Sequence, residues 1–212
     1  HKLNHPDLLQ TNSYIDGEFV KSPSTFDVCN PFNGDVVAKV GDAGEKESQS
    51  ALASAEKAFT SWRTTPASER QRHLQNWREQ MITHWQDMAT ILSLETGKPF
   101  EQAEHELMGS EGFLSWYGEE AKRILGYTVP NPDPKRRFST IFQPVGVVVA
   151  ITPWNFPLVL ILQKCAAAIA AGCTVIVKPA EDTPLSALAL AYLADQAGLP
   201  KGVFNVITPQ KP

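Results

Sequence analysis

The last seventy residues alternate between short apolar runs and helix-like segments, and this alternation constrains the fold more than any other feature of the chain. The three runs and the two segments between them lie at 145–151, 157–171, 173–177, 184–197 and 203–207. The runs lack polar alternation, which is typical of parallel strands covered on both faces. Gly172 and Gly198 follow the two segments, as expected at helix ends. The pattern predicts an α/β fold with a β-α-β-α-β unit, half of a Rossmann-like parallel sheet.

Small hairpins and three amphipathic helices are predicted ahead of this unit. The hairpin turn signals are Asp16-Gly17 and Asn33-Gly34, and we expect these small strands to pack on the side of the larger domain. Apolar residues at helical spacing predict helices over Ala51–Trp62, from Thr65-Pro66 through the stripe Leu74–Leu92, and over Pro99–Ile124.

The segment 126–142 is rich in proline and asparagine and predicts an extended two-stranded excursion. An isolated ribbon of two strands is marginal in water, so it is expected to pack on something else, such as another subunit. The predicted organisation is therefore hairpins and helices of a cofactor-binding domain at 1–125, an oligomerisation ribbon at 126–142, and the first part of the Rossmann-like sheet at 143–212.

Composition excludes several classes of protein. With 212 residues, 42% hydrophobic and 20% charged, the chain is globular, and a net charge of -4 gives no reason to expect a nucleic-acid partner. The longest apolar stretch, Pro157–Ala171, is interrupted by Gln163 and Lys164 and is too short to cross a bilayer, which takes ~20 residues. The basic run Lys135–Arg137 is interpreted as a solvated loop. The chain begins with His1, so a clipped or processed end is expected.

The cysteines indicate neither a metal site nor a disulfide framework. They are odd in number and widely spaced, at Cys29, Cys165 and Cys173. A reducing compartment fits this pattern. We therefore predict no metal and a location in the cytoplasm, with the mitochondrial matrix as the alternative.

Ligands of such sheets lie beyond the carboxyl ends of the strands, which directs attention to two segments. Thr152-Pro-Trp-Asn-Phe-Pro157 follows the first run, and Lys178-Pro-Ala-Glu181 follows the second. No G-x-G-x-x-G fingerprint is present in the sequence. Glu181 can accept hydrogen bonds from both ribose hydroxyls and would repel a 2′-phosphate, which favours NAD over NADP. An acid that starts a helix is an equally good interpretation of the spacing.

Segments 142–157, 170–184 and Glu95-Thr-Gly-Lys-Pro99 resemble the aldehyde dehydrogenase superfamily, and the resemblance covers nearly the whole chain. The amino-acid sequence of Asp182–Leu190 is most similar to that of the succinate-semialdehyde dehydrogenase branch. The resemblance implies an NAD-dependent oxidation of an aldehyde to a carboxylic acid, with NADP as the alternative cofactor. It also implies a homodimer or homotetramer that associates through the 126–142 ribbon.

Residue roles follow from the same resemblance. Asn155 matches the family's side-chain donor to the oxyanion, with a turn residue that bonds its own backbone as the alternative. Lys178 and Glu181 match the residues that hold the adenosine ribose, and Trp154 matches an aromatic of the cofactor channel or, alternatively, a core residue. The full set implied for the cofactor is Ile151, Thr152, Pro153, Trp154, Lys178, Pro179, Ala180 and Glu181.

The family reaction also needs a Cys nucleophile, a Glu that activates water, and a glycine-rich segment, and all three are expected beyond the end of this chain, so its catalytic domain is predicted to be absent. None of the three cysteines matches the nucleophile, so we expect the chain alone to be inactive. Gln163 stands where the semialdehyde branch has an Arg for the substrate carboxylate, which favours a neutral aldehyde, with succinate semialdehyde as the alternative substrate. A binding or assembly module that uses Phe138–Phe142 to add a strand to a partner is the alternative function, and a fragment without function is a third.

Overall fold

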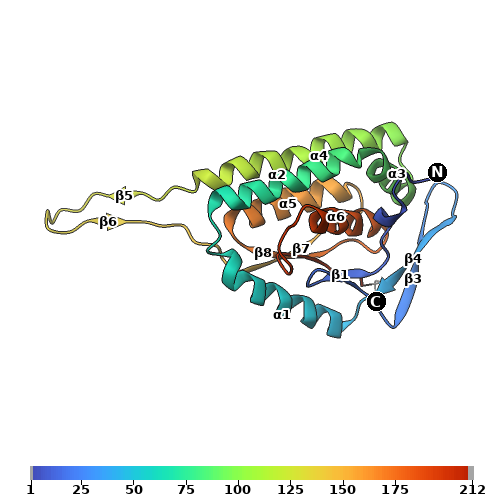
Figure 1. Ribbon diagram of the computed structural model, residues 1–212, viewed down its shortest axis with the longest axis horizontal. Coiled ribbons are helices and arrows are strands. Elements are labelled where there is room, and N and C mark those ends of the chain that lie inside the picture. The colour runs from blue at the N-terminus through green and yellow to red at the C-terminus, as the bar shows by residue number, and fades with distance from the viewer. Residues whose placement is uncertain (1, 210–212) are drawn as a thin grey trace.

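The computed structural model describes residues 2–209 and confirms the predicted α/β architecture (Figure 1). The parallel strands are β7 (Val147–Ile151), β8 (Thr174–Lys178) and β9 (Phe204–Val206). Helices α5 (Pro157–Ala171) and α6 (Leu185–Gln196) connect them. Both helices end before a glycine at positive φ, 93° at Gly172 and 74° at Gly198, a backbone conformation that glycine adopts without steric cost.

The first hairpin belongs to the main sheet, so the expectation that it packs on the side of the domain is wrong. Its strands are β1 (Ser13–Ile15) and β2 (Glu18–Val20), and the sheet order is β2-β1-β9-β8-β7. Tyr14 of β1 lies opposite Val206 of β9 in an antiparallel pair. The turn is as predicted, because Asp16 and Gly17 both have positive φ, 52° and 79°. The second hairpin, β3 (Ser24–Cys29) with β4 (Val36–Asp42), forms a separate two-stranded sheet.

Helices cover the sheet in layers. Helix α1 (Glu45–Trp62) packs on one face, and α5 and α6 pack on the other (Figure 1). Helices α2 (Ala67–Thr83) and α4 (Phe100–Glu120) lie outside α5 and α6. Short 3-10 turns are present at Pro6–Leu8 and Ala121–Arg123.

The second predicted helix is two helices, which corrects the expected count of three ahead of the sheet. Helix α2 ends at Thr83 and α3 (Trp85–Thr96) begins after His84, whose φ of -106° and ψ of 22° are not helical. Trp85 is 37% exposed and so leaves the buried stripe, while Met81 and Met88 on either side are fully buried. Because the apolar spacing continues across the break, periodicity alone gave no sign of it.

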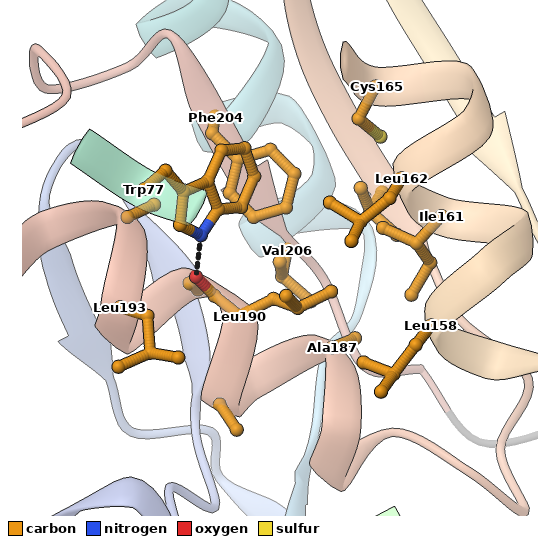
Figure 2. Packing of buried hydrophobic residues seen from close by; sticks show 14 of the residues in the cluster. Trp77, Leu158, Ile161, Leu162, Cys165, Ala187, Leu190, Leu193, Phe204 and Val206 are labelled. Carbon is orange, nitrogen blue, oxygen red and sulfur yellow. Dashed lines mark hydrogen bonds between the residues drawn. The ribbon is translucent and has the colours of Figure 1, made fainter. Parts of the chain in front are cut away.

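The main core lies between the sheet and the layer of α5 and α6. Figure 2 shows Trp77 of α2 reaching into it, where the indole N–H donates to the carbonyl of Leu190 at 3.1 Å. The ring of Trp77 lies 4.9 Å from that of Phe204, centroid to centroid, in an edge contact. This packing fixes α6 against β9 and so fixes the strand ends where a ligand would lie.

Strand β7 is the edge of the sheet and is less covered than its apolar sequence predicted. Val149 and Ile151 are 58% and 70% exposed, because α1 covers only the start of this strand at Val147.

The predicted ribbon is present as β5 (Thr128–Val129) and β6 (Phe138–Ser139), and it projects away from the body (Figure 1). In the part of the chain that is described, no helix has the length and apolarity needed to cross a membrane.

Candidate functional site

The parallel register of β7 and β8 brings the two predicted segments together. Ile151, the last residue of β7, lies beside Lys178, the last residue of β8, and the Thr152 N–H donates to the Lys178 carbonyl at 3.1 Å. Lys178 Nζ lies 3.5 Å from a carboxylate oxygen of Glu181. The two side chains are partly exposed, Lys178 at 28% and Glu181 at 20%. The two segments thus form one surface at the carboxyl edge of the sheet.

The residues between these positions form the base of that surface. Pro179, Ala180 and Thr152 are buried. The Thr152 hydroxyl oxygen is buried and has no hydrogen-bond partner among residues 2–209. A buried polar atom without a partner is costly unless something else satisfies it, so this surface has capacity for a polar ligand or water.

In the turn 152–157, Asn155 is exposed, and its backbone is held by Lys98, a residue far away in the sequence. Lys98 Nζ lies 3.3 Å from the Asn155 carbonyl oxygen and 5.0 Å from the ring centroid of Phe156. Lys98 also forms an ion pair with Glu106 of α4, whose carboxylate is 1% exposed. The main chain of the turn is held by a charged group, while the Asn155 side chain stays accessible.

Two buried carboxylates, Glu95 and Glu106, cap the helices that follow the site. Glu106 accepts the Leu158 N–H at 3.0 Å, at the start of α5. Glu95 of α3 accepts the N–H groups of Leu185 and Ser186 at 2.7 and 3.0 Å, at the start of α6. These N–H groups have no partner within their own helix, so each carboxylate satisfies a helix end. Burial raises the pKa of Glu95 to about 8, and this outweighs the hydrogen bonds to its charged form.

Trp154 does not pack in the core, because it is 61% exposed. It lines a cleft of about 450 Å³ together with Glu95 of α3, Asp182 after β8, and residues of β3. The alternative interpretation as a core aromatic is therefore wrong. Gln163 lies exposed on α5, one turn and a half beyond the Pro157 start of that helix.

The cysteines occupy structural positions. Cys165 of α5 and Cys173 before β8 are buried, and burial raises the pKa of the Cys165 thiol well above its ordinary range. Cys29 is exposed but sits at the end of β3. A thiolate is the reactive form of cysteine, so Cys165 is unsuited to act as a nucleophile.

Sequence reasoning missed Glu106 and gave no role to Lys98 or Glu95, although it singled out the Glu95–Pro99 motif. The capping bonds join residues 52 to 91 positions apart, which local spacing cannot reveal. The one available signal was the unusual run of a charged residue, a glycine, a lysine and a proline between two helices.

Comparison with known proteins places this geometry in a family. The aldehyde dehydrogenase family matches residues 19–212. The mitochondrial succinate-semialdehyde dehydrogenase of Homo sapiens is 47% identical over 200 residues, which are 94% of this chain and 37% of that protein. The glutarate-semialdehyde dehydrogenase of Pseudomonas aeruginosa is 44% identical over 209 residues, 98% of this chain and 43% of that protein.

Solved structures agree. An NADP-dependent enzyme from E. coli superposes with a TM-score of 0.97 at 44% identity, covering 99% of this chain and 44% of that one. Betaine aldehyde dehydrogenase from Staphylococcus aureus, in complex with NAD+, gives a TM-score of 0.91 at 32% identity over 95% of this chain and 41% of that one. This chain therefore spans about two fifths of the length of these relatives, and it belongs to the aldehyde dehydrogenase family.

Proposed function

We propose that this chain supplies the adenosine end of a nicotinamide-cofactor site and one oxyanion donor of an enzyme that oxidises an aldehyde to a carboxylic acid. The observation that carries the proposal is the register of β7 and β8, which places the turn with Asn155 beside the Lys178–Glu181 pair. Family membership supports the reaction class. The activity of the whole protein is part of the proposal, because the chain spans only 37% to 43% of its curated relatives.

Glu181 is the residue proposed to select the cofactor. Its carboxylate accepts hydrogen bonds from the two ribose hydroxyls, and its charge disfavours a 2′-phosphate, so NAD is the proposed cofactor. Lys178 holds that carboxylate in place and donates to the same sugar. The exposed Ile151 and the backbone of Thr152 and Pro153 line the path toward the aldehyde, and a bound nicotinamide would supply the hydride acceptor.

Asn155 is the proposed donor to the oxygen that gains negative charge when a nucleophile attacks the aldehyde. Its role needs a fixed main chain and an accessible amide, and both are present, because Lys98 contacts its carbonyl while the residue is exposed. A fixed donor stabilises developing charge without reorganisation of its surroundings. None of the described thiols fits the nucleophile, so we expect the 212-residue chain by itself to form no NADH from an aldehyde.

Gln163 bears on the substrate. A glutamine cannot form the charge-assisted, bidentate pair that an arginine forms with a carboxylate. The two curated relatives named above are semialdehyde dehydrogenases, but Gln163 favours a neutral aldehyde as the substrate of this protein. The ribbon 126–142 is proposed to join subunits into a dimer or tetramer, since Phe138, Ile141 and Phe142 are 52%, 76% and 62% exposed.

Replacement of Asn155 tests the proposed chemistry in the full-length protein. Asn155→Ala should lower turnover about 10²–10³-fold, because one oxyanion donor is lost, while the affinity for NAD stays the same. Gln49→Ala, which removes an exposed amide from α1 on the other face of the sheet from α5, is the control and should leave turnover unchanged. Turnover retained in Asn155→Ala would remove this residue from the mechanism.

Replacement of Glu181 tests the cofactor assignment separately. Glu181→Ser should weaken NAD binding and improve NADP binding, because the carboxylate acceptor and its repulsion of a phosphate are both lost. Kd values for NAD and NADP measured by calorimetry on both proteins give the preference. An unchanged ratio of the two Kd values would show that Glu181 does not select the cofactor.

A further inference from the structure

Three side chains of metal-ligand type meet where the N-terminal segment crosses the start of α3. They are His5, His84 and Asp87, and one candidate ligand atom of each lies within 4.8 Å of the other two. Two imidazoles and a carboxylate are a ligand set that suits zinc. The question is whether the fold holds these groups in place.

His84 and Asp87 are fixed by the break between α2 and α3. The His84 N–H donates to the Gln80 carbonyl at 3.1 Å, and its own carbonyl accepts the Met88 N–H at 3.0 Å, so its backbone ends one helix and begins the next. Asp87 follows three residues later in the first turn of α3 and is 3% exposed. Residues three apart in this geometry lie on the same side of the chain.

His5 is held against Asp87 by its own backbone. The two carboxylate oxygens of Asp87 accept the N–H groups of Asn4 and His5, each at 2.8 Å. The next turn anchors the segment further, since the Leu8 N–H donates to the His5 carbonyl at 3.1 Å and the Leu8 side chain is 1% exposed. The Asp87 carboxylate and the buried Leu8 side chain thus hold His5 at the start of α3.

The imidazole rings of His5 and His84 are in contact edge to face. Their ring centroids are 4.5 Å apart with an interplanar angle of 88°. Within residues 2–209, the buried Nδ1 of His84 has no hydrogen-bond partner. Within the described part of the chain, Oδ2 of Asp87 accepts one hydrogen bond, from the His5 N–H. Its second lone pair is available to a cation.

We propose that His5, His84 and Asp87 bind a zinc ion that fastens the N-terminal segment to the start of α3. Ligand atoms around a tetrahedral zinc ion, with bonds of about 2.0–2.1 Å, lie about 3.4 Å apart, so the group must contract slightly. His5 is exposed, so its side chain has room to move toward the other two ligands. Water completes the coordination, and the role is structural and independent of the proposed function.

Zinc binding by the purified chain tests the proposal. Titration calorimetry with zinc chloride should show one site, and cobalt in place of zinc should give the visible absorption of tetrahedral coordination. Loss of an outer-shell partner alone costs about 10–100-fold in metal affinity, so His5→Ala and His84→Ala should each weaken binding at least tenfold. His105→Ala, an exposed histidine of α4 outside the cluster, should bind as the original chain does.

Two results would overturn the proposal. The first is zinc binding that survives both His5→Ala and His84→Ala. The second is the absence of zinc binding in the original chain, because the cluster would then be a ring contact that docks the N-terminal segment. Circular dichroism checks the fold of each variant. If His84→Ala fails to fold, the exposed His5→Ala still decides the matter.

Discussion

Buried carboxylates at two helix ends are the residues on which the geometry of the site most depends. Glu106 is neutralised in part by Lys98, and this pair also contacts the carbonyl of Asn155. Glu95 performs the same capping for α6 from within a fully buried environment. Breaking a buried charged contact by removing one partner is costly, so these residues hold the turns that present Asn155 and Glu181.

The raised pKa of Glu95 predicts that stability falls as pH rises. The folded chain keeps this proton up to about pH 8, whereas the unfolded chain releases it near the ordinary value of 4.5. Between these two values the folded state binds more protons, so the free energy of unfolding decreases with pH. Each pKa unit corresponds to about 1.4 kcal/mol, which makes the total loss a few kcal/mol at most.

Urea denaturation at pH 5 and pH 8 measures this effect in the original chain and in Glu95→Gln. The variant should show a smaller decrease between the two pH values, because an amide does not titrate. Glu104→Gln, which changes a less buried acid of α4, is the control and should keep the original pH dependence. Equal slopes in the original chain and in Glu95→Gln would mean that another group is responsible.

At the level of residues, the sequence predicted the two segments of the proposed site but not the side chains that hold them. The segments that carry Asn155 and Glu181 could be predicted because strand ends follow apolar runs that are visible in the sequence. Lys98, Glu95 and Glu106 act across the fold, and nothing in their local pattern shows which helix end they will reach.

The ribbon is the element whose geometry is most sensitive to a single change at its base. A Cβ added at Gly126 would lie 1.9 Å from the Thr140 carbonyl oxygen, closer than any real contact allows. The backbone of Gly126 and Thr140 would have to separate there, next to the point where Tyr127 and Thr140 are hydrogen bonded.

Gly126→Ala should therefore distort the ribbon and weaken subunit association in the full-length protein, while the stability of the domain stays nearly the same. Sedimentation measures the association, and urea denaturation measures the stability. Gly112→Ala makes the same chemical change at a position of α4 where a Cβ meets nothing within 4 Å. This control should leave association intact and should favour the helix by about 0.5–1 kcal/mol.

Element types could be predicted from periodicity, but the ends and breaks of helices could not always be. Gly172 and Gly198 mark their helix ends because glycine tolerates the left-handed backbone found there. His84 carries no such mark, since histidine is an ordinary helical residue and the apolar stripe runs past it. The break lies beside Asp87, whose carboxylate accepts N–H groups of the N-terminal segment, a contact that local periodicity does not reveal.

The sheet as a whole joins the two ends of the described chain. Tyr14 of β1 is buried and donates its hydroxyl to Asp195 of α6 at 3.1 Å. Ser13 and Thr208 lie within 3.0 Å through their hydroxyl oxygens. Short strands with few residues carry little information about distant partners, so the sequence predicted the hairpin but not its place in the sheet.

Tyr14→Phe should destabilise the entire domain, because it removes the hydrogen bond from the buried Tyr14 hydroxyl to the exposed Asp195 carboxylate. Hydrogen bonds to charged groups contribute about 1.5–3 kcal/mol, and we expect a decrease near the lower end of this range. The unfolding curves followed by fluorescence and by circular dichroism should still coincide. Tyr127→Phe, in the exposed ribbon, is the control. Separate transitions for the two probes would show that the hairpin unfolds independently.

The pairing of β1 with β9 has a consequence for how the protein is made. A ribosome adds about 5–20 residues per second, so β1 emerges roughly ten seconds or more before its partner strand. During this interval the hairpin Ser13–Val20 has no neighbour in the sheet, and a two-stranded hairpin alone is marginal in water. The nascent chain therefore exposes an unpaired strand edge until synthesis passes residue 206, and unpaired strand edges are prone to aggregation.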